Sequence, residues 1–221
     1  MDWLFDLFNQ AEEFITDVST SPWFYLVLFS LVTLDSVIPA VPSEFTVIAG
    51  GVASAAGTLI DEQRLLSVVL VILVAALAAY TGDSLAYLIG NRSERLVRAV
   101  FFRGEKGDAR LNATAAQVRK RGGVFLVTAR FIPAGRTAMT FSCGLTGQPF
   151  WSWFTRWDLL AAMLWAIYVA LLGFFVSGVV EDQSTALWLA FGLALSITAL
   201  SELIRSWRDR RSGSTQPAEK P

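Results

Sequence analysis

The chain has no histidine and a single cysteine, Cys143, among its 221 residues. One cysteine cannot form a disulfide within the chain, and without histidine we expect no thiolate or imidazole metal cluster. The lack of histidine also excludes Ser-His-Asp hydrolases, HExxH metalloproteases and membrane phosphatases with a histidine nucleophile. A glycine-rich phosphate loop with Lys and Ser/Thr is missing too. We therefore predict a protein that is not an enzyme and that binds neither a metal nor a cofactor.

Basic residues are missing from the first part of the chain, because no Lys or Arg precedes Arg64. A cleavable secretory signal needs a basic n-region, so we do not expect one here. Residues 1–18 instead place apolar side chains on one helical face and acidic and amide side chains on the other. This pattern predicts an amphipathic helix that lies in the membrane interface. A soluble helix that packs on a partner is the alternative.

Long runs without any charge dominate the rest of the chain, which is 54% hydrophobic. Three of them hold 18, 22 and 19 residues, at 65–82, 159–180 and 183–201. Each run is long enough to cross about 30 Å of hydrocarbon as a helix. A buried core helix explains one such run but not three in so short a chain. The sequence therefore predicts an integral membrane protein.

Basic residues gather in two regions that flank these runs. Residues 92–121 carry nine of them, and the tail 205–221 carries five. The positive-inside rule places both regions, and hence the C-terminus, in the cytoplasm. Nucleic-acid binding is the rival interpretation of residues 92–121. The region flanks apolar spans and offers few aromatic side chains for stacking, so we expect no nucleic-acid partner. The tail has the composition of a disordered segment.

Two similar passages interrupt the apolar runs with prolines and charges. One contains Pro39 and Pro42, and the other contains Pro133. In residues 122–150 each arm around the break has about ten residues, which is too short to span a membrane. We interpret 19–60 and 122–150 as re-entrant hairpins, whose broken backbone must be covered by protein or face a water-filled cavity. The alternative for 19–60 is one or two ordinary spans with a proline kink.

The order of amphipathic helix, hairpin and transmembrane helix occurs twice, and the second copy starts on the opposite side of the membrane. The segments are 1–18, 19–60 and 65–91 in the first copy, and about 107–121, 122–150 and 159–180 in the second. A further transmembrane helix at 183–204 completes a membrane domain over 19–204. The predicted fold is thus all-α and integral to the membrane, with an inverted repeat like that of many secondary transporters.

The two hairpins hold four charged residues at membrane depth, namely Asp35, Glu44, Arg130 and Arg136. Each costs about 2.5–3.5 kcal/mol on insertion scales. Two acids and two bases balance in charge, so we expect them to pair in a shared cavity. Structural pairing alone is a weak explanation, because apolar residues often stabilise a protein as well as a buried ion pair does. Charged residues inside a membrane are functional by default.

The chemistry of these four residues suggests two roles. Arg130 and Arg136 present a planar fork of donors that suits a phosphate group and keeps its charge. Asp35 and Glu44 can titrate, because burial and a neighbouring arginine shift a carboxyl in opposite directions. We therefore expect the arginines to bind the substrate phosphate and the acids to exchange protons between two facing states.

Asp83 and Ser43 are candidates of the second rank. Asp83 lies on the helix predicted at 65–91, with Tyr80 and Tyr87 on the same face to hydrogen-bond it. The alternative is that Asp83 is solvated near the cytoplasmic end of that helix. Ser43 can donate to a phosphate, or it can act as a local cap at the proline turn.

Three motifs, DSVIPAVPSE, GDSLAYLIGNR and RFIPAGR, resemble the signatures of the DedA family, also called the SNARE-associated or VTT-domain family. The resemblance covers about residues 20–180. It departs from the common pattern at Asp35, where Glu is frequent, and at Cys143, where Ala is frequent; neither change removes a charge. The resemblance implies a bacterial inner-membrane protein that moves undecaprenyl phosphate or phospholipid head groups between leaflets and depends on the proton gradient.

We therefore expect a proton-coupled flippase whose partners are a phosphate-bearing membrane lipid and protons; a homo-oligomer is left open. Three alternatives stay open as well: a proton- or cation-coupled transporter of a small solute, a non-enzymatic assembly protein of the membrane, and an energy-independent lipid scramblase. A solute transporter would work without any lipid requirement. An assembly protein would tolerate neutralisation of both arginines.

Overall fold

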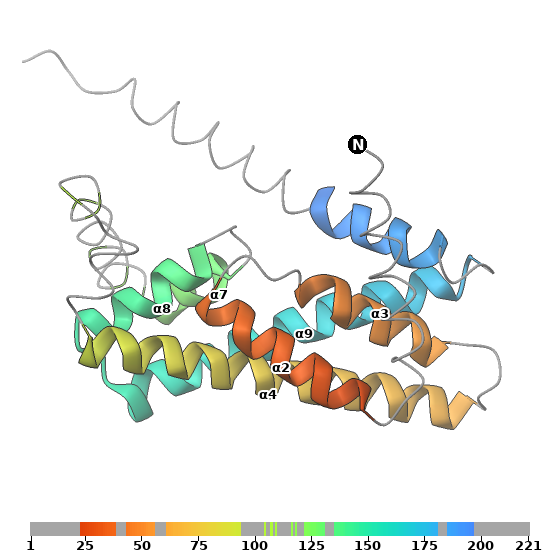
Figure 1. The fold of residues 1–221 in the computed structure, drawn as a ribbon, viewed down its shortest axis with the longest axis horizontal. Helices are drawn as coiled ribbons and strands as arrows, with labels where there is room; N and C mark the ends of the chain where they lie inside the picture. Colours follow the sequence, from red (N-terminus) through yellow and green to blue (C-terminus); the bar gives the residue numbers. More distant parts are fainter. Residues whose placement is uncertain are drawn as a thin grey trace, which may run out of the picture.

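The computed structural model describes residues 23–38, 43–55, 61–93, 122–130, 135–180 and 185–196, together with five isolated positions between 104 and 118. Within this part of the chain every regular element is a helix, which confirms the all-α prediction (Figure 1). The elements are α2 (Phe24–Val37), α3 (Ser43–Ala55), α4 (Asp61–Arg92), α7 (Gly123–Ala129), α8 (Gly135–Leu145), the π-helix η1 (Phe150–Phe154), α9 (Thr155–Ser177) and a last helix, Thr185–Ser196.

Several predicted features lie outside the described residues. These are the amphipathic helix at 1–18, most of the basic loop 92–121, the tail 205–221, and the hairpin breaks Pro39, Pro42 and Pro133. The last predicted span, 183–204, is described only in part, as the helix Thr185–Ser196.

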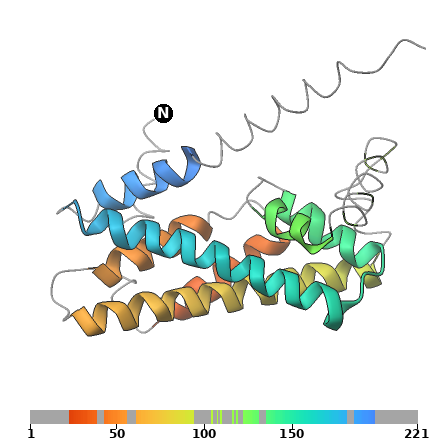
Figure 2. The same ribbon diagram turned by 180° about the vertical axis from the view of Figure 1, so that it is seen from behind.

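Two long helices, α4 and α9, pack against each other and run antiparallel (Figure 2). The apolar helical stretches Gln63–Arg92 and Phe150–Ser177 hold 30 and 28 residues, the second including the π-helix. At about 1.5 Å per residue each exceeds the roughly 30 Å of bilayer hydrocarbon. Both helices are therefore long enough to serve as the spans expected at 65–91 and 159–180.

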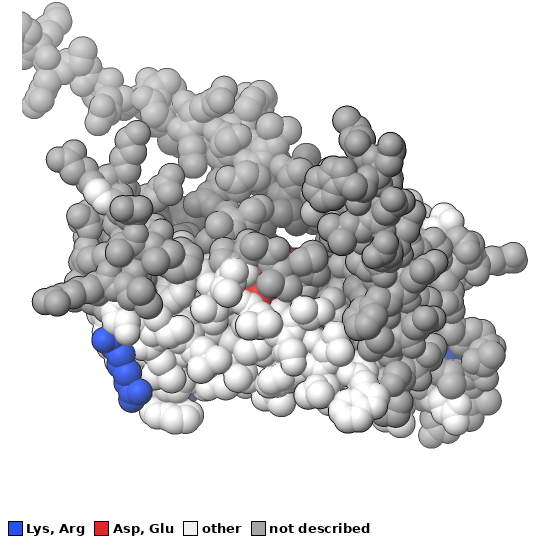
Figure 3. Space-filling model, in the orientation of Figure 1, with Lys and Arg blue, Asp and Glu red and all other residues white. Residues whose placement is uncertain are grey.

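The surface of the described helices is strongly apolar. Large apolar side chains are exposed along α2 and α4, among them Leu26, Leu66, Leu70, Leu73 and Leu77. The described surface in Figure 3 is almost uncharged, with basic atoms near its edges and a small acidic spot near its centre. A soluble monomer rarely exposes so much contiguous apolar surface, whereas lipid tails can cover it. The described helices thus have the exterior that a bilayer favours.

Four short helices pack on the long pair. They form two helix pairs, α2 with α3 and α7 with α8. The first helix of each pair packs mainly on the long helix that follows it in the chain, α2 on α4 and α7 on α9. The second helix packs mainly on the other long helix, α3 on α9 and α8 on α4. They hold 14, 13, 7 and 11 residues. At about 1.5 Å per residue, each is shorter than the hydrocarbon of a bilayer. Pro39 and Pro42 lie between α2 and α3 in the sequence, and Pro133 lies between α7 and α8.

Glycines allow α3 to approach α9 closely. A Cβ atom added at Gly51 would lie 2.2 Å from the carbonyl oxygen of Ala170, and one added at Gly173 would lie 2.3 Å from that of Ile48. Distances this short leave no room for any side chain. Backbone therefore packs directly against backbone where these helices cross.

The crossing of α8 and α4 is equally close. A Cβ atom at Gly144 would lie 2.2 Å from the carbonyl oxygen of Tyr87, and one at Gly90 would lie 2.7 Å from that of Phe141. The glycines of α4 thus serve helix packing, as small residues do in membrane bundles.

Alanine at either crossing should destabilise the fold. Gly51→Ala and Gly144→Ala each force two backbones apart, and overpacking of this kind costs about 1–3 kcal/mol. Gly192→Ala is the control, because a Cβ atom there meets open space in a helix. The measurement is thermal unfolding of the purified protein in detergent. Equal midpoints for the three variants would contradict the tight crossings.

Candidate functional site

The ends of the short helices meet beside α4. Asp35 lies in the last turn of α2, and Ser43 and Glu44 begin α3. Arg130 directly follows α7, and Arg136 lies in the first turn of α8. Arg136 donates to Asp35, although 101 positions separate them in the chain. The fold therefore brings together residues that flank the two proline-containing segments.

The first ion pair joins the two helix pairs. Arg136 Nη2 donates to Asp35 Oδ2 over 2.8 Å, and Ser43 Oγ donates to the same oxygen over 2.6 Å. The Arg136 and Asp35 side chains are only 13% and 9% exposed. Two of the three predicted phosphate donors, Arg136 and Ser43, are thus held by the Asp35 carboxylate, and an incoming anion must compete with Asp35 for them.

Arg130 is enclosed more completely. Its Nη1 lies 2.5 Å from Asp83 Oδ2 on α4 and 3.6 Å from Asp158 Oδ1 on α9. Its Cζ lies 5.3 Å from the ring centroid of Trp165, within range of a cation–π contact. The three charged side chains are at most 2% exposed. Arg130 therefore pairs with the long helices rather than with an acid of the first hairpin, which corrects the expected pairing.

Asp83 links the two arginines. Its Oδ2 binds Arg130, and its Oδ1 lies 3.9 Å from Arg136 Nε. Asp83 is fully buried, so the alternative of a solvated residue is wrong. The expected hydrogen bonds from its neighbours are wrong as well, because the hydroxyl of Tyr80 pairs with a threonine of α9 and that of Tyr87 donates to a backbone carbonyl. Asp83 thus contacts both arginines and also faces Asp158.

Glu44 lies at the edge of this network. It is half-buried and interacts electrostatically with Asp35, Arg136 and Arg130. It forms no ion pair with another residue in the described part of the chain. Of the predicted site residues it is therefore the one whose carboxylate is least constrained by a partner.

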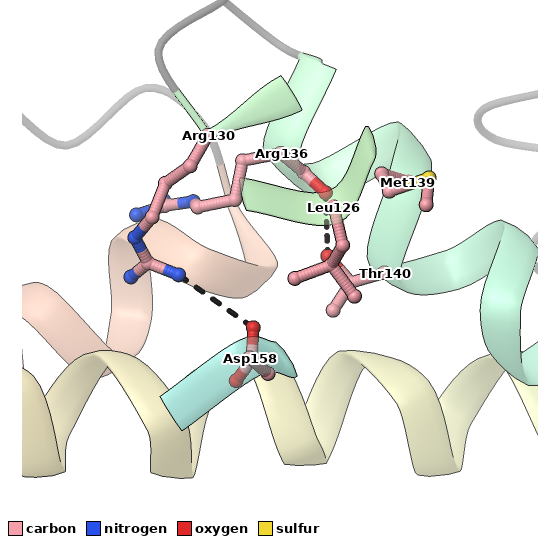
Figure 4. A pocket seen from close by; sticks show the side chains of 6 residues that line it. All are labelled: Leu126, Arg130, Arg136, Met139, Thr140 and Asp158. Atoms are coloured by element: carbon pink, nitrogen blue, oxygen red, sulfur yellow. Dashed lines mark hydrogen bonds and ion pairs between the residues drawn. The ribbon is translucent and has the colours of Figure 1, made fainter. Parts of the chain in front are cut away.

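A small pocket lies between the arginines and α9 (Figure 4). It is lined by Leu126, Arg130, Arg136, Met139, Thr140 and Asp158. The space open to the centre of a water-sized molecule is about 10 Å³, which suffices for about one water. A phosphate group is too large for it. The described conformation is therefore closed to such a ligand.

The site has more acid than base. Four carboxyls interact with two guanidinium groups, the carboxyls being those of Asp35, Glu44, Asp83 and Asp158. If all were ionised, two negative charges would be uncompensated, and unpaired buried charge is strongly unfavourable. Arg130 Nε, Arg130 Nη2 and Asp158 Oδ2 are also buried without a hydrogen-bond partner among the described residues. The closed site therefore holds more acidic groups than its two arginines can neutralise.

Sequence analysis missed Asp158. It stands directly before the uncharged run 159–180 and two positions after Arg156, so it resembled an interfacial residue. The helical spacing could have identified Asp158, because the residues three, four, seven and eight positions after it lie on the same face of the helix. The buried residues there are Ala161, Ala162, Trp165 and Ala166. An acid in line with such a stripe must face the protein interior.

Comparisons with known proteins agree with this picture. Residues 36–175 match the VTT domain. The chain is 26% identical over 201 residues to Protein DedA of Escherichia coli (strain K12), covering 84% of each chain. It is 27% identical over 180 residues to the Uncharacterized membrane protein ML0287 of Mycobacterium leprae (strain TN), covering 80% of this chain and 75% of that protein. No solved structure matches. Because the VTT domain covers more than half of the sequence, the chain belongs to the DedA family of membrane proteins.

Proposed function

We propose that this protein moves a phosphate-bearing lipid, such as undecaprenyl phosphate or a phospholipid, between the leaflets of the bacterial inner membrane, coupled to protons. The observation that carries the proposal is the pair of arginines that flank the gap between α7 and α8, each held by aspartate. Arginine among apolar helices is costly unless an anion accompanies it. The aspartates stand where the oxygens of an anionic ligand would bind.

Phosphate suits the donors that the arginines offer. Among the described residues Arg130 Nε and Nη2 have no hydrogen-bond partner, and both arginines line the same pocket. A phosphate oxygen pair can accept parallel hydrogen bonds from a guanidinium fork. Because the present space is water-sized, binding requires the helix pairs to separate. In this proposal the described conformation is the closed state of a transport cycle.

The matching contacts of the two halves support an inverted repeat. Gly51 faces the carbonyl three positions before Gly173, and Gly173 faces the carbonyl three positions before Gly51. Gly144 and Gly90 have the same reciprocal relation. The crossing of α3 with α9 therefore has the same geometry of contacts as the crossing of α8 with α4. This supports two re-entrant hairpins that enter from opposite sides, around a site near the midplane.

The Arg136–Asp35 contact connects substrate binding to movement. It is the ion pair that joins the two helix pairs, so separating them must break it. A head group that binds Arg136 takes the place of Asp35 and so breaks this ion pair. Inverted-repeat transporters commonly work by moving one unit against the other around a fixed site.

The coupling to protons follows from the excess of acidic groups in the site. A bound phosphate adds negative charge to four carboxyls and two guanidinium groups. Protonation of Asp35, Glu44 or Asp83 offsets that charge. Substrate and proton are therefore favoured together, which is the condition for coupled transport.

The distribution of basic residues supports the orientation. Residues 92–121 carry nine and the tail 205–221 carries five, and the positive-inside rule puts such regions in the cytoplasm. The end of α4 and the start of α9 lie at the same end of the molecule (Figure 2), which becomes the cytoplasmic end.

Replacement of the arginines tests phosphate binding. In liposomes with undecaprenyl phosphate, or with phosphatidylglycerol in a parallel set, Arg130→Ala and Arg136→Ala should each slow head-group translocation about 10–100-fold. A hydrogen bond to a charged group contributes about 1.5–3 kcal/mol. Lysine should give intermediate rates, because it keeps the charge but not the fork. Arg156→Ala, at an exposed position of α9, is the matched control and should keep the wild-type rate.

Each outcome of the arginine experiment separates the candidate functions. Wild-type translocation by the double variant Arg130→Ala/Arg136→Ala would refute phosphate binding by these arginines, whereas a wild-type protein that moves neither lipid would favour an assembly role. Solute uptake into liposomes without either lipid would favour a solute transporter. Translocation that ignores an imposed pH gradient would favour a scramblase.

Neutralising the hairpin acids tests the coupling. Asp35→Asn and Glu44→Gln keep size and hydrogen-bonding capacity but cannot titrate. We expect each variant to insert normally and to lose the dependence of translocation on an imposed pH gradient. The measurement is translocation rate against the gradient for wild type and both variants. An unchanged slope in both would rule out coupling through these acids.

A further inference from the structure

The charge of Arg130 is already compensated by Asp83, so a second acid, Asp158, is not needed to stabilise it. Asp83 already lies 2.5 Å from Arg130 Nη1, whereas Asp158 Oδ1 lies 3.6 Å from the same nitrogen. The longer distance is an ion-pair contact but not a hydrogen bond. Asp158 Oδ2 is buried and has no hydrogen-bond partner among the described residues. Asp83 Oδ1 is likewise buried without a hydrogen-bond partner among the described residues, but it lies 3.9 Å from Arg136 Nε; most buried polar atoms have such a partner, so a buried oxygen without one calls for an explanation.

The groups that face Asp158 come from several helices. They are Asp83 of α4, Arg130 after α7, and Arg136 and Cys143 of α8. The arginines keep their charge at all relevant pH values. Asp83 is anchored by contacts to both arginines, whereas among the described residues Asp158 has one long ion-pair contact and a side-chain interaction with Asp83, an acid like itself. Asp158 is therefore the acid of this group that is held most weakly in its ionised form.

The pocket gives a proton access to this acid. Asp158 and Arg130 both line it (Figure 4), and both carry buried polar atoms that have no hydrogen-bond partner in the part of the chain that the structure describes. The space suits about one water, and a water there could bond to these groups. Such a water can deliver a proton to Asp158 Oδ2 or accept one from it.

We infer that Asp158 is a proton-exchange site that controls whether Arg130 is available to a phosphate. Ionised, Asp158 shares Arg130 with Asp83. When a proton binds to Oδ2, the carboxyl becomes neutral and its attraction to Arg130 ends. One negative charge of a phosphate can then take its place beside Arg130 without changing the net charge. When the phosphate leaves, Asp158 returns the proton to water.

This inference rests on the proposed function for its ligand, but it concerns a different coupling residue. Asp35 and Glu44 belong to the helix pair α2–α3, whereas Asp158 belongs to α9 and acts on the other arginine. The proton that frees Arg130 is thus separate from any proton that breaks the Arg136–Asp35 contact.

Infrared titration of the full-length protein in phosphatidylcholine liposomes tests the proton site without a transported ligand. The carbonyl band of protonated carboxyls should contain a component that disappears as the pH rises in wild type and that is missing in Asp158→Asn. Asp158→Glu should restore a titrating band. In Arg130→Gln the band should persist to a pH about 1–3 units higher, because the cation that favours the ionised form is gone. Arg156→Gln should leave the titration unchanged. Size-exclusion elution and thermal unfolding identify any variant that fails to fold.

A second arm tests control of Arg130. The pH profile of head-group translocation, measured with undecaprenyl phosphate and with phosphatidylglycerol, should flatten in Asp158→Asn and be kept in Asp158→Glu. Identical titrating bands in wild type and Asp158→Asn, or identical pH profiles of translocation, would overturn the inference. If wild type moves neither lipid, the proposed function fails, and the band and its response to Arg130→Gln still decide whether Asp158 exchanges a proton under the influence of Arg130.

Discussion

The pairing of two buried arginines with aspartates from separate helices is the interaction on which the rest of the site depends. Asp35 comes from α2, Asp83 from α4 and Asp158 from α9, and the arginines flank the gap between α7 and α8. Removing one partner of a buried ion pair costs about 3–5 kcal/mol, because the other charge is left uncompensated. The network therefore fixes how both helix pairs sit against the long helices.

Close helix packing makes this charge network possible. The glycine crossings bring α3 onto α9 and α8 onto α4 with backbone against backbone. Each helix pair is thereby tied to the long helix of the other half, so the ends of the short helices cannot drift away from α4. The charged side chains then reach one another in an interior that contains little space, and a change in their pairing is transmitted to the helices that carry them.

The sequence indicated much of the site, because charges and prolines inside apolar runs are conspicuous. Asp35, Glu44, Arg130 and Arg136 stood out on the cost of placing charge in a membrane, and Asp83 on its position within a long apolar helix. The partners of each charge were harder to predict. Arg130 was expected to pair within the hairpins, and Asp158 was overlooked because it borders an uncharged run rather than interrupting it.

The all-α class, the two long apolar helices and the costly charges among the apolar helices follow from the amino-acid sequence, because length, hydropathy and charge are local properties. The pairing of Arg136 with Asp35, and of Arg130 with Asp83 and Asp158, is seen first in the folded protein. These choices depend on how α2, α4, α7, α8 and α9 cross, and the crossings depend on contacts between residues far apart in the chain. Pattern along one segment carries no information on which distant segment will face it.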